Sequence, residues 1–517
     1  MDARRQLRLV LLSFLMLFLE LMLIRWGAAN VLYLAYFTNF VLLASFLGIG
    51  VGFLRSRSHR GHFAQAPVAV ALALGFVALL PVQVDSANRL VGLFGWRALP
   101  VWVSLPIIFA LATAAMALVA EGVARTFATF SPLAAYRLDI LGSLLGIAAF
   151  SGLAFLHAPP VVWGAVVAAA FVLLLRGPLD QRSLRAAELE PGESGPARRS
   201  AGRPVGASRL GPVQIVALLA VVIGLGAVSL VPDQYWSPYY QVSVSRSPHG
   251  VEAIKVNGLP HQSIYPVSLL RRSGAFYLYP YRHLKDRPLG DVLVVGAGNG
   301  NDVAVALSKG ARHVDAVEID PVIQAIGARD HTDRPYQDPR VSVHIDDGRA
   351  FLQRSGRRYD LIIFALPDSL TLVSGQSSLR LESYLFTLQA MRSVRAHLRA
   401  GGVFTMYNYY RPDVFDRFAE TITRAFGHPP SIDRGPVSSG PRRQAVLTVG
   451  RAASDIVNAT PWVAPARAPA IATDDWPFPY LESRSIPRFY VITLLLILAA
   501  SAALVRGFGG PFGQMRP

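Results

Sequence analysis

The sequence contains no cysteine among its 517 residues, which excludes disulfide bonds, thiolate metal ligands and a cysteine nucleophile. Charged residues are also scarce, at 16% of the chain, whereas apolar residues make up 52%. This balance is unusual for a soluble protein and favours one embedded in a membrane. A chain of this length is also expected to fold into more than one structural unit.

The net charge of +17 could indicate a nucleic-acid partner. The arginines, however, cluster between apolar segments, as at Arg55, Arg57 and Arg60. Basic clusters of this kind anchor the cytoplasmic ends of transmembrane helices. We therefore expect the lipid bilayer as a partner and no nucleic acid.

Eight apolar stretches are candidate membrane spans. Residues 1–176 are predicted to form a transmembrane helical domain of about six spans, followed by a basic flexible linker at 177–211. A further transmembrane helix is expected at 212–231, and a C-terminal one at 487–507. The stretches are Leu9–Ile24, Val31–Leu54, Pro67–Val84, Val101–Val119, Leu133–Phe155, Val161–Leu175, Val213–Val231 and Phe489–Val505.

The region between the last two spans has the sequence pattern of a soluble domain. Residues 232–288 predict a small β subdomain with a hairpin around 248–250, and 456–486 a juxtamembrane segment. Residues 289–455 alternate strand and helix patterns, which predicts a doubly wound, mostly parallel sheet of the Rossmann-like type. The predicted strands are Asp291–Val295, His313–Asp320, Val341–Asp346, Tyr359–Leu366, Gly402–Tyr407 and Gln444–Val449, and the clearest helices are Asp302–Lys309, Glu382–Arg399 and Pro412–Phe426.

A glycine-rich loop follows the first of these strands, with Gly296, Gly298 and Gly300 around Asn299. Glycines let a backbone turn tightly and approach a ligand, and the next helix offers free N–H groups at its start. Glu318 lies about twenty residues on, where an acid can accept hydrogen bonds from ribose hydroxyls.

The third strand also ends in carboxylates, and Asp347 there could accept a hydrogen bond from an adenine amino group. The fourth strand runs into Asp368. Acids at successive strand ends indicate a nucleoside-cofactor site. His261 and His283 show no metal spacing, so no metal is expected.

The run from Val292 to about Gly427 resembles the spermidine/spermine synthase (polyamine aminopropyltransferase) family, and Gln241 and Gln262 upstream resemble its small N-terminal β-domain. The whole chain is similar to membrane-embedded bacterial spermidine-synthase-like proteins. The resemblance implies a class I S-adenosylmethionine-methyltransferase fold that binds decarboxylated S-adenosylmethionine or S-adenosylmethionine. The cofactor-binding residues implied are Gly296, Gly298, Asn299, Gly300, Glu318, Asp347 and Gln241.

The resemblance is weaker at the amine site. Ala365 stands where the family has the acid that helps deprotonate the attacking amine, and Asn299 stands where it has the aspartate that contacts the cofactor's amine. Asp368 is the remaining candidate catalytic residue, with capping of the following turn as the alternative. Asp474 and Asp475 before the last span either approach the site or belong to an interfacial anchor.

These features predict a membrane-bound transferase that moves an aminopropyl group to a small-molecule amine acceptor, and a homodimer stays open. The alternatives are a methyltransferase using S-adenosylmethionine and a non-catalytic ligand-sensing or transport-associated membrane protein. The predicted location is the bacterial inner membrane. The arginine bias places the α/β domain outside if seven spans precede it, whereas an adenosyl cofactor is expected in the cytoplasm, so the sequence leaves the side open.

Overall fold

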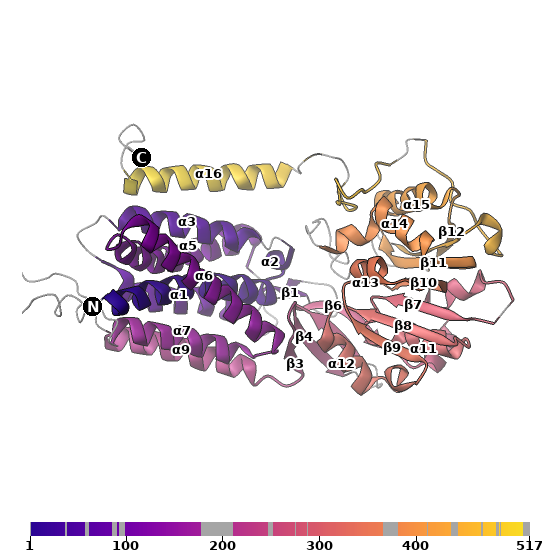
Figure 1. Ribbon diagram of the computed structural model, residues 1–517, viewed down its shortest axis with the longest axis horizontal. Helices are drawn as coiled ribbons and strands as arrows, with labels where there is room; N and C mark the ends of the chain where they lie inside the picture. Colours follow the sequence, from indigo (N-terminus) through magenta and orange to yellow (C-terminus); the bar gives the residue numbers. More distant parts are fainter. Residues whose placement is uncertain are drawn as a thin grey trace, which may run out of the picture. The chain divides into compact units, whose positions relative to one another are not determined.

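A computed structural model of the protein shows two units (Figure 1). The first comprises Met1–Gln241 with Ile486–Pro517, and the second Val242–Ser485. The structure describes residues 2–36, 39–56, 61–84, 90–91, 99–176, 210–246, 252–273, 276–286, 288–365, 381–410, 412–435, 443–466, 469–481, 485 and 488–509.

The first unit is built mainly of apolar helices. Among the described residues, four are long and apolar enough to cross a membrane: α1 (Asp2–Asn30), α5 (Val101–Phe127), α6 (Pro132–Phe155) and α9 (Pro212–Ser229). Shorter apolar helices are α3 (Asn39–Arg55), α4 (Ala66–Leu79, entered from the 3₁₀ turn Phe63–Gln65), α7 (Pro160–Leu175) and the apolar part, Val491–Gly507, of α16 (Arg488–Gly509).

Each predicted span thus contains a helix, but only half of these helices reach spanning length among the described residues. The span predicted at Val31–Leu54 divides into α2 (Leu32–Tyr36) and α3, with residues 37–38 outside the described part.

Small residues let the helices of this unit approach closely. A Cβ on Gly142 of α6 would lie 2.3 Å from the carbonyl oxygen of Val10 in α1, and one on Gly48 of α3 would lie 2.5 Å from that of Thr113 in α5. Such contacts between backbones are typical of helix packing in membranes.

The second unit begins with three antiparallel strands, β4 (Gln241–Arg246), β5 (Glu252–Val256) and β6 (Leu259–Ile264). Strands β4 and β5 confirm the predicted hairpin, whose turn lies outside the described residues. Strand β6 was not predicted. Asn257 and Gly258 connect β5 to β6 with φ angles of 49° and 75°, as a tight two-residue hairpin turn requires.

A seven-stranded sheet forms the centre of the second unit, in the order β12-β13-β11-β10-β7-β8-β9. The five strands from β9 to β11 are parallel, whereas β13 runs antiparallel to both β11 and β12. This mixed order is that of the class I S-adenosylmethionine-methyltransferase-like fold. The strands are β7 (Asp291–Val295), β8 (His313–Glu318), β9 (Val341–Ile345), β10 (Tyr359–Ala365), β11 (Leu398–Tyr410), β12 (Ser431–Arg434) and β13 (Arg443–Gly450).

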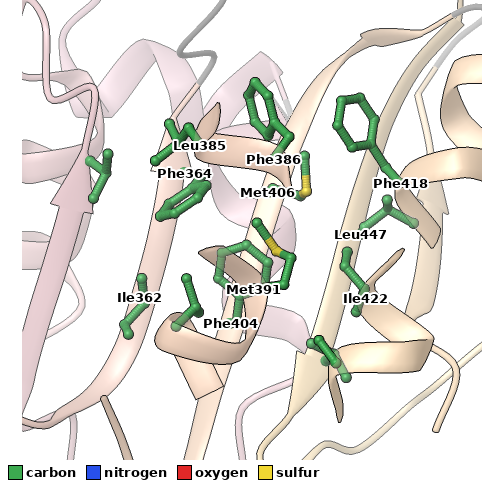
Figure 2. Close-up of a cluster of buried hydrophobic side chains, with 14 of the residues drawn as sticks. Ile362, Phe364, Leu385, Phe386, Met391, Phe404, Met406, Phe418, Ile422 and Leu447 are labelled. Atoms are coloured by element: carbon green, nitrogen blue, oxygen red, sulfur yellow. The ribbon is translucent and has the colours of Figure 1, made fainter. Parts of the chain in front are cut away.

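Both faces of the sheet are covered, as the alternation of its side chains requires. Along β7, Leu293 and Val295 join one core with helices α13 (Gly348–Arg354), α14 (Leu388–Ala396) and α15 (Pro412–Phe426). Figure 2 shows part of this core, with Phe364, Phe404 and Phe418 from β10, β11 and α15. The opposite face, with Val292 and Val294, packs against α10 (Val267–Ser273), the 3₁₀ helix η4 (Phe276–Arg282) and α11 (Asn301–Ser308).

The six strands predicted in this domain are all present, but some elements differ. Helix α12 (Pro321–Asp330) and strand β12 were not among the named predictions. The helix expected at Glu382–Arg399 is shorter, because Leu381–Phe386 forms a 3₁₀ helix and Thr387 caps α14 by accepting the Ala390 N–H.

Candidate cofactor and acceptor site

The loop after β7 turns back sharply over the end of β8. The N–H groups of Gly296 and Ala297 both donate to the carbonyl of Val317, at 2.9 and 3.0 Å. Gly296, Gly298 and Gly300 all have positive φ, at 76°, 53° and 95°. The loop therefore has the left-handed conformations that glycine adopts at little cost, as the sequence predicted.

Glu318, the last residue of β8, faces this loop. Its carboxylate accepts the N–H of Gly298 at 2.8 Å and the N–H of Asp320 at 2.9 Å. The side chain is buried, and burial raises its pKa to about 7. A carboxylate has about four acceptor positions, so two remain for donors such as ribose hydroxyls.

Asp347 stands at the end of β9, where the sequence placed it. It is the N-cap of α13 and accepts the Ala350 N–H at 2.8 Å. Capping uses one of its oxygens and leaves the other free to accept a further donor. Along the carboxyl edge, the order is therefore Asp347 after β9, Glu318 after β8 and the glycine loop after β7.

A glutamine does reach the loop, and it is Gln262 of β6. Its Oε1 accepts the N–H of Asn299 at 2.9 Å, and a Cβ on Gly298 would lie 2.2 Å from its side chain. Gln241, which was predicted to bind the cofactor, is buried at the first position of β4. The family resemblance includes Gln262 as part of the N-terminal β-domain, but it did not predict a contact between Gln262 and the glycine loop.

Asn299 has a side chain that is only half satisfied. Its Oδ1 accepts the N–H of Asn301 at 3.2 Å, which identifies Nδ2 as the other amide atom. Among the described residues Nδ2 has no hydrogen-bond partner, although the side chain is 2% exposed. A buried donor of this kind requires an acceptor that the described protein atoms do not supply.

Sequence analysis missed Tyr336, which closes the loop from the 3₁₀ turn Pro335–Gln337. Its hydroxyl donates to the carbonyl of Gly298 at 2.6 Å. Burial raises the pKa of Tyr336 well above its ordinary value, and the charges of Glu318 and Asp302 raise it further. No local pattern marks this tyrosine, which comes 38 residues after its partner.

The predicted amine-site residues meet different outcomes. Asp368 lies outside the described residues. Ala365 is the buried last residue of β10. Asp474 pairs with Arg349 at 2.6 Å and accepts the Thr387 hydroxyl at 2.7 Å, so its carboxylate serves a structural contact.

The described residues contain no group of three or more His, Asp or Glu side chains that could hold a metal ion. The polar groups around the loop are carboxylates, amides and phenols. These groups suit hydrogen bonding to a nucleoside.

The model of the spermine/spermidine synthase domain matches residues 283–421. A polyamine aminopropyltransferase of Alkaliphilus metalliredigens is 30% identical over 139 residues, which are 26% of this chain and 45% of that protein. The corresponding enzyme of Vibrio vulnificus is 27% identical over 137 residues, 26% of this chain and 43% of its own length. The chain thus spans about half the length of the curated relatives it matches.

Among solved structures, the spermidine synthase of Thermotoga maritima has a TM-score of 0.33 and 15% identity, covering 50% of this chain and 84% of that one. The family match begins just after η4, includes β7 and the glycine loop, and ends within α15. Residues 283–421, within the α/β unit, therefore match the spermine/spermidine synthase domain.

Proposed function

We propose that the α/β unit binds an S-adenosyl sulfonium and transfers its aminopropyl group to an amine acceptor. The observation that carries this proposal is the buried carboxylate of Glu318, held against the glycine loop through the Gly298 N–H. A buried acid with free acceptor positions at the carboxyl edge of a parallel sheet is suited to the ribose of a nucleoside. The family match supports the same site.

The order of groups along the edge indicates how the cofactor lies. Asp347 after β9 suits the adenine amino group, and Glu318 after β8 suits the ribose. The 5′ substituent then extends in the opposite direction, over the loop that contains Asn299 and toward the end of β10. The reactive carbon beside the sulfur would thus lie near Ala365, which precedes Asp368 by three residues in the sequence.

The sulfonium activates its own leaving group, so the protein's part is to position the reactants and to take up a proton. The amine lone pair attacks the carbon attached to sulfur, and the C–S bond electrons pass to sulfur to leave a neutral thioether. Asp368 is proposed to orient the amine or accept its proton.

Asn299 favours a second candidate, in which the cofactor is S-adenosylmethionine. Decarboxylated S-adenosylmethionine ends in an ammonium group, which an aspartate suits. The unpartnered Nδ2 of Asn299 is a donor and instead suits the carboxylate of the intact amino acid. A methyltransferase of the same fold would use that cofactor.

We also propose that the first unit is integral to a bilayer, in the inner membrane of a bacterium. This rests on α1, α5, α6 and α9, which have spanning length and composition, and on the shorter apolar helices beside them. Protease protection in sealed vesicles would report the side on which the α/β unit lies.

Calorimetric titration of the full-length protein with S-adenosylmethionine, its decarboxylated form and methylthioadenosine tests the cofactor site. Binding of at least one of the three is expected. Replacing Glu318 with Ala removes charge-assisted hydrogen bonds worth about 1.5–3 kcal/mol and should weaken binding roughly tenfold or more. Folded protein that binds none of the three ligands would overturn the proposal.

The same titrations distinguish the two cofactors. If Asn299 holds a carboxylate, S-adenosylmethionine binds more tightly than the decarboxylated form, and Asn299→Asp reverses this order. Methylthioadenosine lacks both groups, so its affinity should change little in the variant. An unchanged order of affinities in Asn299→Asp would remove the reason for the second candidate.

A further inference from the structure

A second buried carboxylate, Asp302, lies in the first turn of α11, three residues after Asn299. Its side chain is 6% exposed, and its Oδ2 accepts the hydroxyl of Tyr407 at 2.5 Å. Its own backbone N–H is a second donor to the carboxylate, and no basic group among the described residues contributes to its pKa.

The missing cation distinguishes Asp302 from three other acids of this unit. Asp291, Asp315 and Asp474 each hold an arginine within 3 Å. Burying a carboxylate without a cation is costly, and here burial raises the pKa of Asp302 to about 7. A cationic ligand that pairs with Asp302 would explain why an acid is buried without a basic partner at the carboxyl edge of the sheet.

Asp302 lies at the end of the sheet where the proposed reaction takes place. Its partner Tyr407 on β11 is the register partner of Ala365, the last residue of β10. Tyr407 and Ala365 are buried on the same face of the sheet, the face covered by α11. Ala365, beside Tyr407, therefore presents only a methyl group. The carboxylate that reaches Tyr407 is that of Asp302 in α11.

Tyr336 contacts both the cofactor loop and the N-cap of α11. Its hydroxyl donates to the carbonyl of Gly298, and a Cβ on Gly300 would lie 3.1 Å from its ring. The charges of Glu318 and Asp302 both raise the pKa of this phenol. Glu318 faces the proposed ribose position, and Asp302 is the second buried acid at this end of the sheet.

Aromatic rings pack around Tyr407, whose hydroxyl is bonded to the carboxylate of Asp302. The rings of Phe276 and Tyr277 lie 4.9 and 5.8 Å from that of Tyr407. Tyr281 has a buried hydroxyl with no partner among the described residues, and its pKa is raised by burial and by the charge of Asp302. Aromatic faces attract cations, so this cluster suits an ammonium on an apolar body.

We propose that Asp302, together with Tyr281 and Tyr407, binds the acceptor amine as an ammonium ion, and that the acceptor is a monoamine with an apolar body. The inference rests on the proposed function, because it supplies that function's second substrate. A single carboxylate among aromatic rings matches one positive charge.

The transfer balances with this assignment. The Asp302 carboxylate takes one proton from the bound ammonium, which exposes the nitrogen lone pair, and Asp368 then has the orienting role of the two proposed for it. The lone pair forms the new C–N bond as the C–S bond breaks and its electrons return to sulfur. The products are a secondary ammonium, a neutral thioether and protonated Asp302, which releases its proton to solvent.

A structural role for Asp302 makes a different prediction. An acid in the first turn of a helix interacts favourably with the helix dipole, and Tyr407 needs only an acceptor oxygen. Asn provides that oxygen without the charge. Asp302→Asn therefore preserves the contact to Tyr407 while removing the counter-ion.

The test uses full-length protein saturated with methylthioadenosine, into which phenethylamine, n-butylamine and putrescine are titrated calorimetrically. Phenethylamine should bind most tightly, and Asp302→Asn should weaken it at least tenfold with the affinity for methylthioadenosine unchanged. Asp286→Asn, which removes an exposed carboxylate of the same unit, should change neither affinity. Melting temperatures report whether each variant is folded.

Equal affinity for phenethylamine in the parent and in folded Asp302→Asn would overturn the inference. So would a parent that binds methylthioadenosine but none of the three amines. A folded parent that fails to bind the nucleoside overturns the proposed function itself, and the inference with it. If Asp302→Asn does not fold, Asp302→Glu replaces it, and a severalfold loss of amine affinity is expected because the charge is displaced by one methylene.

Discussion

The guanidinium of Arg349 holds both carboxylate oxygens of Asp474, at 2.9 and 2.6 Å. Arg349 follows Asp347, the N-cap of α13, by two residues, and Asp474 lies in the segment before the C-terminal helix. The pair therefore fastens that segment to α13, and it lowers the pKa of Asp474 through the hydrogen bonds from Arg349.

Asp474→Asn is predicted to lower the free energy of unfolding by about 1 kcal/mol, since a partly exposed bidentate pair contributes on that order. Nucleoside affinity should stay the same, because Asp474 does not face the glycine loop. Thermal unfolding and calorimetry measure the two effects. If the variant instead loses turnover of the amine without losing stability, Asp474 belongs to the acceptor site.

Gly298→Ala is predicted to weaken nucleoside binding, because the added Cβ would displace the amide of Gln262, which accepts the Asn299 N–H. The residue has a φ of +53°, and an added Cβ would lie 2.2–2.6 Å from the side chain of Gln262. Gly310→Ala is the matched control, because Gly310 has a φ of +83° with nothing within 4 Å of the added Cβ. The control should lose about 1–3 kcal/mol of stability through φ alone and keep its ligand affinity. If Gly298→Ala and Gly310→Ala bind the nucleoside with similar affinity, the contact between position 298 and Gln262 has no effect on binding.

Little or no spermidine is predicted to form from putrescine. A dication requires carboxylates to offset its desolvation, and the family acids are replaced by Ala365 and Asn299. Among the described residues, the group proposed to bind the amine (Asp302, Tyr281 and Tyr407) contains one carboxylate, that of Asp302. Chromatography of reactions with decarboxylated S-adenosylmethionine checks this, and efficient spermidine formation would show the inference from these two positions to be wrong.

Asp368→Asn is predicted to lower turnover roughly a hundredfold with cofactor affinity and melting temperature unchanged. Asn caps a turn nearly as well as Asp but is neither a base nor a counter-ion. The readout separates this residue from Asp302, whose replacement should also weaken amine binding. Parental turnover in Asp368→Asn would indicate a capping role and leave Asp302 as the carboxylate for the amine.

The stability of the α/β unit should carry a pH dependence from its two buried acids. Burial raises the pKa of Glu318 from 4.5 to about 7 and that of Asp302 from 3.8 to about 7. Between pH 4 and 7 the folded state therefore binds more protons than the unfolded state. The contribution of these two groups to the free energy of unfolding therefore falls as the pH rises. Relative to the parent, the double variant Glu318→Gln, Asp302→Asn should be more stable at pH 8 than at pH 5. Thermal melts at the two values measure this, and a difference that does not depend on pH would contradict it.

The sequence by itself determined the features that arise from short-range patterns. The apolar stretches predicted the helices, alternating segments predicted the parallel strands, and the glycine spacing predicted a tight loop before Glu318. These features depend on hydrogen bonds and side-chain periodicity within a few residues of one another. Asp347 could be placed in the same way, because the end of a parallel strand always lies at the ligand edge.

Only the tertiary structure decided which side chains meet across that edge. Asp302 and Tyr407 are 105 residues apart, and Arg349 and Asp474 are 125 apart. Their contacts follow from the strand order and from the register that sets Tyr407 beside Ala365, which no local pattern specifies. In the proposed acceptor site, the carboxylate that the sequence lacks at position 365 is supplied by Asp302 of α11, because a packed helix can present an acid where the neighbouring strand has a methyl group.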